Sequence, residues 1–231
     1  MKKIFTLIAV AAMAMSANAQ SNSSWIFGEE KWHSGFDADG KPVSKEYAEA
    51  ATIDGLTITA TSSAKMTVDA NKKTVDGVAY IGRLKTGGAG GFSGDAVEQR
   101  TIKFNVAGNS TIDIIASGSN GTDDRVLNIF TETYTSENKT TPNATIEIIA
   151  ADGAKKYTYN YTGGTATTIT LASNSGGINF YAIYATNVVT GINTVKAAET
   201  ENGAAYNIAG QKVADDFKGV VIKNGRKMIQ K

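Results

Sequence analysis

The sequence predicts an all-β protein, an antiparallel β-sandwich of the jelly-roll kind, and three observations support this. Apolar and polar residues alternate in short runs: Leu56 and Ile58 fall on one face of a strand and Thr57 on the other. Gly, Asn, Asp and Ser bound these runs. Between residues 21 and 191 no window spaces its apolar residues as a helix does. Closely spaced short strands with few helices are typical of a sandwich.

The alternating runs give the expected strands in chain order. They cover residues 53–60, 78–85, 101–106, 111–117, 125–131, 144–150, 155–161, 167–172 and 178–186. Turn residues at 107–110 and at 151–154 separate neighbouring runs, which predicts two hairpins. The two prolines, Pro42 and Pro142, fall in predicted connections, where a missing N–H costs no ladder hydrogen bond.

The N-terminus has the features of a signal peptide. Lys2 and Lys3 precede an apolar stretch too short to span a bilayer, and small residues follow up to Ala19. We expect cleavage after Ala19, export, and a location in the medium or on the outer cell surface, with the periplasm as the remaining option. No later stretch is long and apolar enough for a membrane helix, so we expect no membrane span.

The composition changes again near the C-terminus. Residues 190–203 are rich in Ala, Glu and Thr and are expected to form a linker. The Asn224-Gly225 pair between two short apolar runs predicts a hairpin in the last segment. The expected organisation is therefore a signal peptide (1–19), a β-sandwich (20–189), this linker, and a short β tail (204–231).

Composition argues against several functions. The net charge is +1, from 23 basic and 22 acidic residues, so we expect no nucleic-acid partner. The chain has no cysteine and a single histidine, His33, whereas most general bases and many metal sites use these residues. Asp37 and Asp39 resemble the start of a calcium loop, but its twelfth position is Ala48 instead of Glu. We expect no catalytic residues, no metal and no cofactor.

The C-terminal tail contains a recognisable series of residues: Tyr206, Asn207, Ile208, Gly210, Gln211, Val213, Gly219 to Ile222, Asn224, Gly225, Arg226 and Lys227. In this series the tail resembles the sorting segments of secreted Bacteroidetes proteins. In that family the longer versions direct export across the outer membrane, and this copy is short. The resemblance implies a secretion signal.

The larger segment contains five short motifs in order along the chain: Trp25-x-Phe27, Asp54-Gly55-Leu56-x-Ile58, Tyr80-x-x-Arg83-Leu84-Lys85, Arg100-x-Ile102-x-Phe104-x-Val106 and Asn174 to Ile183. In these motifs it is similar to the non-catalytic β-sandwich modules that accompany pectate lyases in Bacteroidetes. It spans most of residues 24–187, and no catalytic module accompanies it. The resemblance implies a stand-alone accessory or surface protein.

Aromatic residues give one set of candidate carbohydrate-binding positions. Trp32 lies between Lys31 and His33, and an exposed indole would stack on a sugar ring, although aromatic residues also fill cores. Tyr157, Tyr159 and Tyr161 share one face of a predicted strand. They form either a platform for glycan or part of the inner face of the sandwich, and the sequence leaves both interpretations open.

Basic residues give the other set. Arg83, Lys85 and Arg100 have the chemistry to bind the carboxylates of uronic acids, with Arg83 and Lys85 on the same strand face. The alternative is solvated surface charge.

Three functions fit the sequence to different degrees. The first is a secreted carbohydrate-binding β-sandwich that recognises plant or host polysaccharide, pectin-like if the basic residues take part. The second is a structural or adhesive cell-surface protein with a protein partner. The third, a hydrolase, needs two facing carboxylates, and no spacing singles out such a pair. The oligomeric state is left open.

Overall fold

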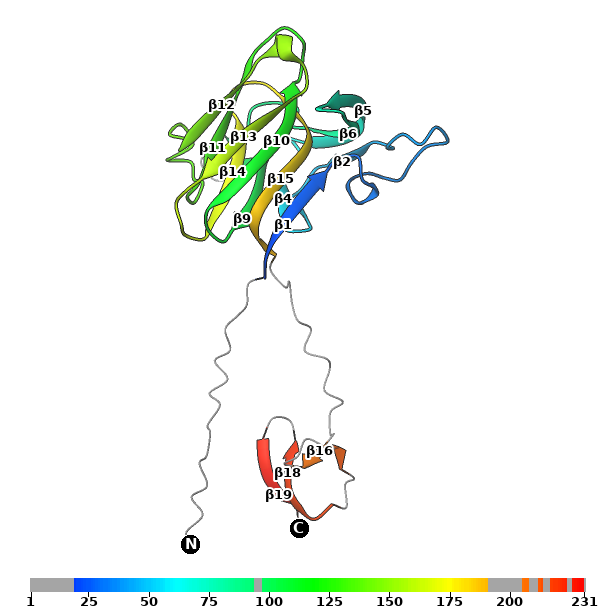
Figure 1. The fold of residues 1–231 in the computed structure, drawn as a ribbon, viewed down its shortest axis with the longest axis vertical. Coiled ribbons are helices and arrows are strands. Elements are labelled where there is room, and N and C mark those ends of the chain that lie inside the picture. Colours follow the sequence, from blue (N-terminus) through cyan, green and yellow to red (C-terminus); the bar gives the residue numbers. More distant parts are fainter. Residues whose placement is uncertain are drawn as a thin grey trace. The chain divides into compact units, whose positions relative to one another are not determined.

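The computed structural model describes residues 19–93, 97–190, 205–207, 212–213, 217–223 and 226–230. The chain divides into two compact units, Met1–Gly191 and Ile192–Lys231. The predicted signal peptide and linker lie almost entirely outside the described residues, so their segment boundaries stay predictions. Figure 1 shows the ribbon of both units.

The larger unit is an antiparallel sandwich of two layers that share the long strand β15, and among its described residues the only helices are two 3-10 turns, Glu30–Trp32 and Ala150–Asp152. In one layer, one edge of β15 (Ile178–Thr190) pairs with β10 (Ser110–Gly118), and β10 pairs in turn with β13 (Lys155–Tyr161). The opposite edge of β15 pairs with both β1 (Ala19–Ile26) and β6 (Val78–Lys85). The layer continues from β6 to β5 (Met66–Val75) and then to β2 (Lys45–Tyr47). The other layer has the order β12 (Ala144–Ile148), β11 (Arg125–Phe130), β14 (Thr167–Ser173), β9 (Thr101–Val106), β4 (Leu56–Thr59) and β3 (Ala51–Ile53). A small ladder joins β7 (Gly91–Ser93) to β8 (Val97–Gln99). These layers confirm the predicted all-β sandwich class.

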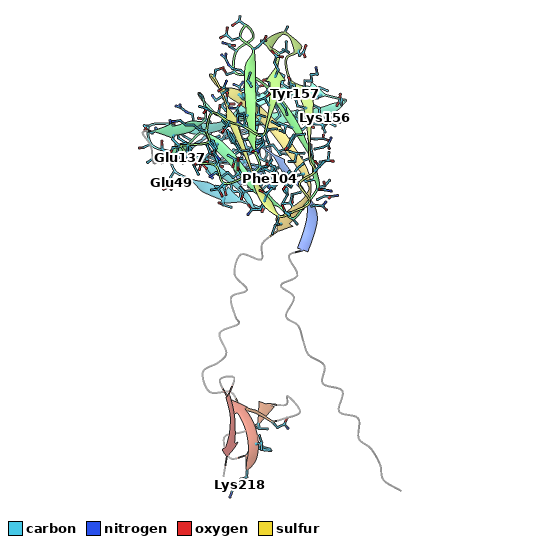
Figure 2. The ribbon with its side chains drawn as sticks, turned by 90° about the vertical axis from the view of Figure 1, so that its left-hand side faces the viewer. Glu49, Phe104, Glu137, Lys156, Tyr157 and Lys218 are labelled. Atoms are coloured by element: carbon cyan, nitrogen blue, oxygen red, sulfur yellow. The ribbon has the colours of Figure 1, made fainter. Side chains whose placement is uncertain are left out.

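The core lies between the two layers and is built from the alternating apolar residues. Trp25 is fully buried with its ring centroid 5.0 Å from that of Phe104, and its indole nitrogen donates to the Asp54 carbonyl at 2.9 Å. Phe104 lies within the sandwich in Figure 2. Burying an aromatic side chain of this size contributes about 1.5–3 kcal/mol, so these rings are major anchors of the fold.

Two predicted hairpins are wrong. The turn at 107–110 joins β9 to β10, and the turn at 151–154 joins β12 to β13, but neither pair of strands is hydrogen-bonded; in each case the chain crosses from one layer to the other. Conversely, the predicted strand 53–60 is broken by a hairpin at Asp54-Gly55. Both turn residues have positive φ, 48° and 79°, as a two-residue type I′ turn requires.

The C-terminal unit is a small antiparallel sheet described by itself. Its strands are β16 (Ala205–Asn207), β17 (Lys212–Val213), β18 (Gly219–Lys223) and β19 (Arg226–Gln230), in the order β17-β16-β18-β19. Lys223 pairs with Arg226, so the hairpin predicted at Asn224-Gly225 is confirmed by the strands that flank it.

Candidate functional site

The β5–β6 hairpin pairs with β15 at its base, through Leu84 and Lys85, and its tip packs against residues of β10 and β15. The Asp76-Gly77 turn of this hairpin has positive φ at both residues, 49° and 79°. Near the turn, Val75 and Tyr80 pack with Ile115 and Tyr181 in a second apolar cluster. In Figure 1 the hairpin lies on the side of the sandwich opposite β11 and β12. Its position leaves cavities along its flanks.

The first cavity, called the Arg83 pocket, has a volume of about 210 Å³ and lies between the β5–β6 hairpin and the segment that follows β10. Its polar lining consists mainly of Asn71, Lys73, Arg83, Asn120, Asn179 and Tyr181. The described residues that line it include two cations and no carboxylate. The pocket therefore combines positive charge with amide groups that donate and accept hydrogen bonds.

Hydrogen bonds fix the side chains at the floor of this pocket. The Tyr181 hydroxyl donates to the Asn71 side-chain oxygen at 2.8 Å. Asn179 donates from its amide nitrogen to the Gly118 carbonyl at 2.9 Å. Tyr181 and Asn179 are almost fully buried, so their orientation is set before any ligand arrives. Such preorganisation lowers the entropic cost of binding.

Asp69 positions the two strand cations beside the pocket. Its carboxylate accepts from Arg83 Nε at 2.8 Å and from Lys85 Nζ at 2.7 Å. Burial alone would raise the pKa of Asp69, but the hydrogen bonds from Arg83 and Lys85 outweigh it and the pKa lies below its usual value. Lys73, by contrast, is exposed and forms no ion pair with any described residue.

A second cavity, called the Ile81 pocket, lies on the other flank of the hairpin and has a volume of about 500 Å³. It is lined by the loop Asp39 to Lys41 and by Ala70, Asn71, Lys72 and Ile81. Lys41 is held by Asp39 at 3.0 Å, whereas Lys72 is exposed and has no ion-pair partner in the described part of the chain. Ile81 is 38% exposed and supplies an apolar wall.

A third cavity of about 300 Å³ differs in charge from the other two. It lies between β1, β10 and β15 and is lined by hydroxyl and amide groups, by Tyr184 and by Asp113. Asp113 accepts a hydrogen bond from Thr158 at 2.5 Å and faces Lys156 at 4.0 Å. No cation lines this cavity among the described residues, so it does not share the chemistry of the Arg83 pocket.

The structure separates the three basic residues that the sequence analysis grouped together. Arg83 lines the Arg83 pocket, and Lys85 contacts the same Asp69 carboxylate as Arg83 does. Arg100 precedes β9 with a positive φ of 55°, and its guanidinium lies against Gly88 in the glycine-rich connection after β6. Arg100 lines neither the Arg83 pocket nor the Ile81 pocket.

Trp32 offers no face to a sugar in this structure. It is fully buried, with its ring centroid 4.9 Å from that of Phe27, and the Tyr47 hydroxyl donates to its backbone carbonyl at 2.8 Å. Of the two roles considered for Trp32, the structure places it in the core. The physical reason is the large apolar area of the indole, which is buried in the main core cluster beside Phe27.

The tyrosine stripe of β13 belongs to the inner face of the sandwich. Tyr161 is buried, and Tyr157 and Tyr159 are half-buried against the main core. Figure 2 shows Tyr157 next to Lys156 on this strand. Because the side chains of a strand alternate, Lys156 takes the outer face while the rings point inward. The stripe is therefore a packing surface and does not form a flat platform for glycan.

Most residues of the Arg83 pocket were not candidates in the sequence analysis. Asn71, Lys73 and Asn120 carry no motif, and Asn179 and Tyr181 appear only within the resemblance to lyase-associated modules. They come together because β10 pairs with β15, β15 with β6, and β6 with β5 in one layer. Sequence spacing contains no sign of that proximity.

The described residues limit two further kinds of site. No helix among them is long and apolar enough to cross a membrane. No group of three or more His, Asp or Glu side chains in the described part of the chain is arranged to hold a metal ion. Asp37, the first residue of the calcium-like run, instead accepts hydrogen bonds from the backbone N–H groups of Asp39 and Lys41, both at 2.9 Å.

Comparisons with known proteins give only distant similarities. No family model matches the chain, and no curated protein matches it. Among solved structures it is similar to the K1 cleaved adhesin domain of Lys-gingipain from Porphyromonas gingivalis W83, with 12% identity over 71% of this chain and 97% of the other and a TM-score of 0.38.

Two further similar structures contain xylan-related modules. One is the CBM22-1 xylan-binding domain of Xyn10C from Paenibacillus barcinonensis, with 14% identity, a TM-score of 0.38, and coverage of 74% of this chain and 97% of the other. The other is the CBM22-1–GH10 part of Xyn10B from Clostridium thermocellum, with 16% identity and a TM-score of 0.38 over 65% of this chain and 30% of the other.

Proposed function

We propose that this chain is an exported, non-catalytic carbohydrate-binding protein whose Arg83 pocket holds an acidic, pectin-like polysaccharide. The observation that carries the proposal is the lining of that pocket, in which Lys73 and Arg83 stand among amide side chains with no carboxylate.

The chemistry of the lining matches a uronic acid. A guanidinium or ammonium group binds a carboxylate through charge-assisted hydrogen bonds. Asn71 uses its side-chain oxygen to accept from Tyr181, and Asn179 uses its side-chain nitrogen to donate to Gly118. The other end of each amide, a donor on Asn71 and an acceptor on Asn179, suits the hydroxyls of a sugar, whereas Asn120 is bonded to Asp123 at both ends. A volume of about 210 Å³ lies below the range typical of sites for drug-sized ligands, so the pocket fits about one sugar unit at a time.

The same lining argues against hydrolysis at this place. Glycoside hydrolases generally need two carboxylates, one on each side of the scissile bond. None of the described residues that line the Arg83 pocket carries one. Asp69, whose carboxylate contacts the lining residue Arg83, is held by Arg83 and Lys85. Binding without turnover is the chemistry that such a pocket supports.

Binding is tested with the full-length mature protein by isothermal titration with polygalacturonate and, as a neutral comparison, with galactan. We expect binding of polygalacturonate alone, weakened about three- to tenfold by Lys73→Ala, because an exposed charge contact is worth up to about 1 kcal/mol and an ordered one somewhat more. Lys139→Ala removes a lysine from the connection between β11 and β12 and serves as the matched control.

Two results would contradict the proposal. Equal binding of galactan and polygalacturonate would remove the role of charge. Absence of binding to plant and host polysaccharides would favour the other candidate, an adhesive surface protein with a protein partner.

The exported state rests on the signal peptide at 1–19 and the sorting-like tail at 204–231. Deleting the tail should leave the protein inside the outer membrane, and the N-terminal sequence of the exported form should begin at Gln20. Release of the tail-less form into the medium would contradict a sorting role. The association with pectate lyases is tested by whether such enzymes are produced together with this protein on pectin.

A further inference from the structure

The β5–β6 hairpin contains a β-bulge at the point where the two cavities approach each other. Ala70 pairs with Gly82 and Lys73 pairs with Tyr80, so Asn71 and Lys72 together stand opposite the single residue Ile81. A bulge of this kind redirects side chains and bends the strand. The two lysines that follow Asn71 line different cavities, as the alternation of side chains along a strand requires: Lys72 lines the Ile81 pocket and Lys73 lines the Arg83 pocket.

Asn71 lines both cavities. Its side-chain oxygen is held by the Tyr181 hydroxyl at 2.8 Å. No acceptor in the described part of the chain takes the N–H groups of its amide. β5 pairs with β2 only through residues 66–68, so the edge of the strand at Asn71 is not covered by another strand. A ligand in the Arg83 pocket can therefore continue past Asn71 over this open edge.

The Ile81 pocket has the groups that a second acidic sugar unit needs. Lys72 and Lys41 supply ammonium groups, of which Lys41 is shared with Asp39. The half-exposed Ile81 side chain supplies an apolar wall against which the C–H face of a sugar ring can pack. The Ile81 pocket therefore offers an acidic sugar both a cation and an apolar wall, on the far side of the bulge from the Arg83 pocket.

We infer that the ligand is an extended stretch of an acidic polysaccharide that crosses β5 at the Asn71–Lys72 bulge and occupies both cavities. This inference rests on the proposed function and deepens it, because it requires a polymer chain where the Arg83 pocket alone needs only a single unit. Contacts on both sides of one strand make affinity depend on chain length.

The test measures the affinity of the full-length mature protein for digalacturonate and hexagalacturonate by titration calorimetry. We expect the hexamer to bind about tenfold more tightly than the dimer, beyond the statistical gain from its additional binding frames. Lys72→Ala should reduce this hexamer-to-dimer ratio about three- to fivefold, the value of one exposed charge contact. Ile81→Ala should reduce the same ratio without changing any charge.

Lys139→Ala, a lysine far along the chain in the β11–β12 connection, should leave the ratio at its wild-type value. Thermal unfolding of each variant separates loss of contact from loss of fold. A wild-type ratio no larger than the statistical gain, or a ratio unchanged by both Lys72→Ala and Ile81→Ala, would overturn the inference while leaving the Arg83 pocket intact as a site. Failure of both oligomers to bind would instead overturn the proposed function and the inference with it.

Discussion

The carboxylate of Asp69 controls how much positive charge the Arg83 pocket offers to a ligand. The single negative charge of Asp69 offsets part of the two positive charges of Arg83 and Lys85, through contacts of 2.8 and 2.7 Å. A sugar carboxylate bound on the far side of the Arg83 guanidinium would lie about 7 Å from Asp69. At that separation two like charges repel by about 0.6 kcal/mol in water and about 2.4 kcal/mol at an effective dielectric constant near 20. Asp69→Asn removes this repulsion.

We therefore expect Asp69→Asn to tighten the binding of polygalacturonate about three- to tenfold, toward the lower end of the calculated range because salt screens partly exposed charges. The substitution should also steepen the dependence of binding on salt. Glu132→Gln is the matched control, because it removes one exposed carboxylate just beyond the end of β11 that is distant from the pocket. Titration calorimetry at two salt concentrations provides both measurements.

The same substitution has a cost in folding stability that depends on pH. The pKa of Asp69 in the folded protein lies below its usual value of 3.8. A carboxyl with a lowered pKa stabilises the fold above its unfolded-state pKa, and this contribution is lost as the pH falls through the folded-state pKa. Asp69→Asn should thus lower the unfolding temperature at pH 7 and have a much smaller effect at a pH below the folded-state pKa of Asp69.

One result would refute this reasoning about charge. If Asp69→Asn weakened the binding of polygalacturonate in protein shown by thermal unfolding to be folded, the ligand would not be attracted by Arg83 and Lys73. An equal gain in affinity from Glu132→Gln would show that overall charge, and not this pocket, drives association.

Three further predictions concern the scaffold. Gly82→Ala should destabilise the protein by about 1–3 kcal/mol in chemical denaturation, because a Cβ there would meet backbone atoms of a neighbouring segment at 2.8 and 2.9 Å. Gly121→Ala is the control: the space around Gly121 is open, so this substitution should change stability by about 0.5 kcal/mol or less. Thr170→Val should leave the stability of the protein unchanged or raise it by about 1 kcal/mol, since the buried Thr170 hydroxyl has no hydrogen-bond partner among the described residues. Thr167→Val should lower the stability, because it removes the hydrogen bond that the Thr167 hydroxyl donates to the Thr131 carbonyl. Deletion of Lys72 should give a folded protein without the extra affinity for hexagalacturonate; retention of that affinity would contradict a role of the bulge.

The strands could be predicted from the sequence because burial on one face of a strand imposes its period on the residues. The expected strands 78–85, 101–106 and 155–161 have the bounds of β6, β9 and β13. The pairing of strands across the connections was harder to predict from the sequence, since a turn motif indicates only the local conformation of the backbone. Whether the chain after a turn pairs with the strand before it, or crosses to the other layer, depends on which apolar faces it must cover. The turns at 107–110 and 151–154 illustrate this limit.

The candidate site was less predictable, because residues far apart in sequence assemble it. Arg83 was a sequence candidate, but its partner Asp69 and the neighbours Asn179 and Tyr181 are identified only by the pairing of β5, β6 and β15. The aromatic candidates failed for the converse reason. Trp32 and the β13 tyrosines have large apolar areas, and in a sandwich without disulfides such side chains are worth more in the core than on the surface.

The bulge itself explains why strand β5 was absent from the predicted set. A regular alternation in residues 66–70 changes phase at Asn71 and Lys72, where two residues stand opposite one. The alternation of apolar and polar residues that identifies a strand therefore breaks off in this segment at Asn71 and Lys72. At the same position the hairpin leaves the sheet and the two cavities begin. An irregularity that costs ladder hydrogen bonds persists only if the surrounding contacts compensate for it, and here Tyr181 holds Asn71 while Val75 and Tyr80 pack beyond the bulge. The interruption of the pattern and the location of the proposed site thus have the same structural cause.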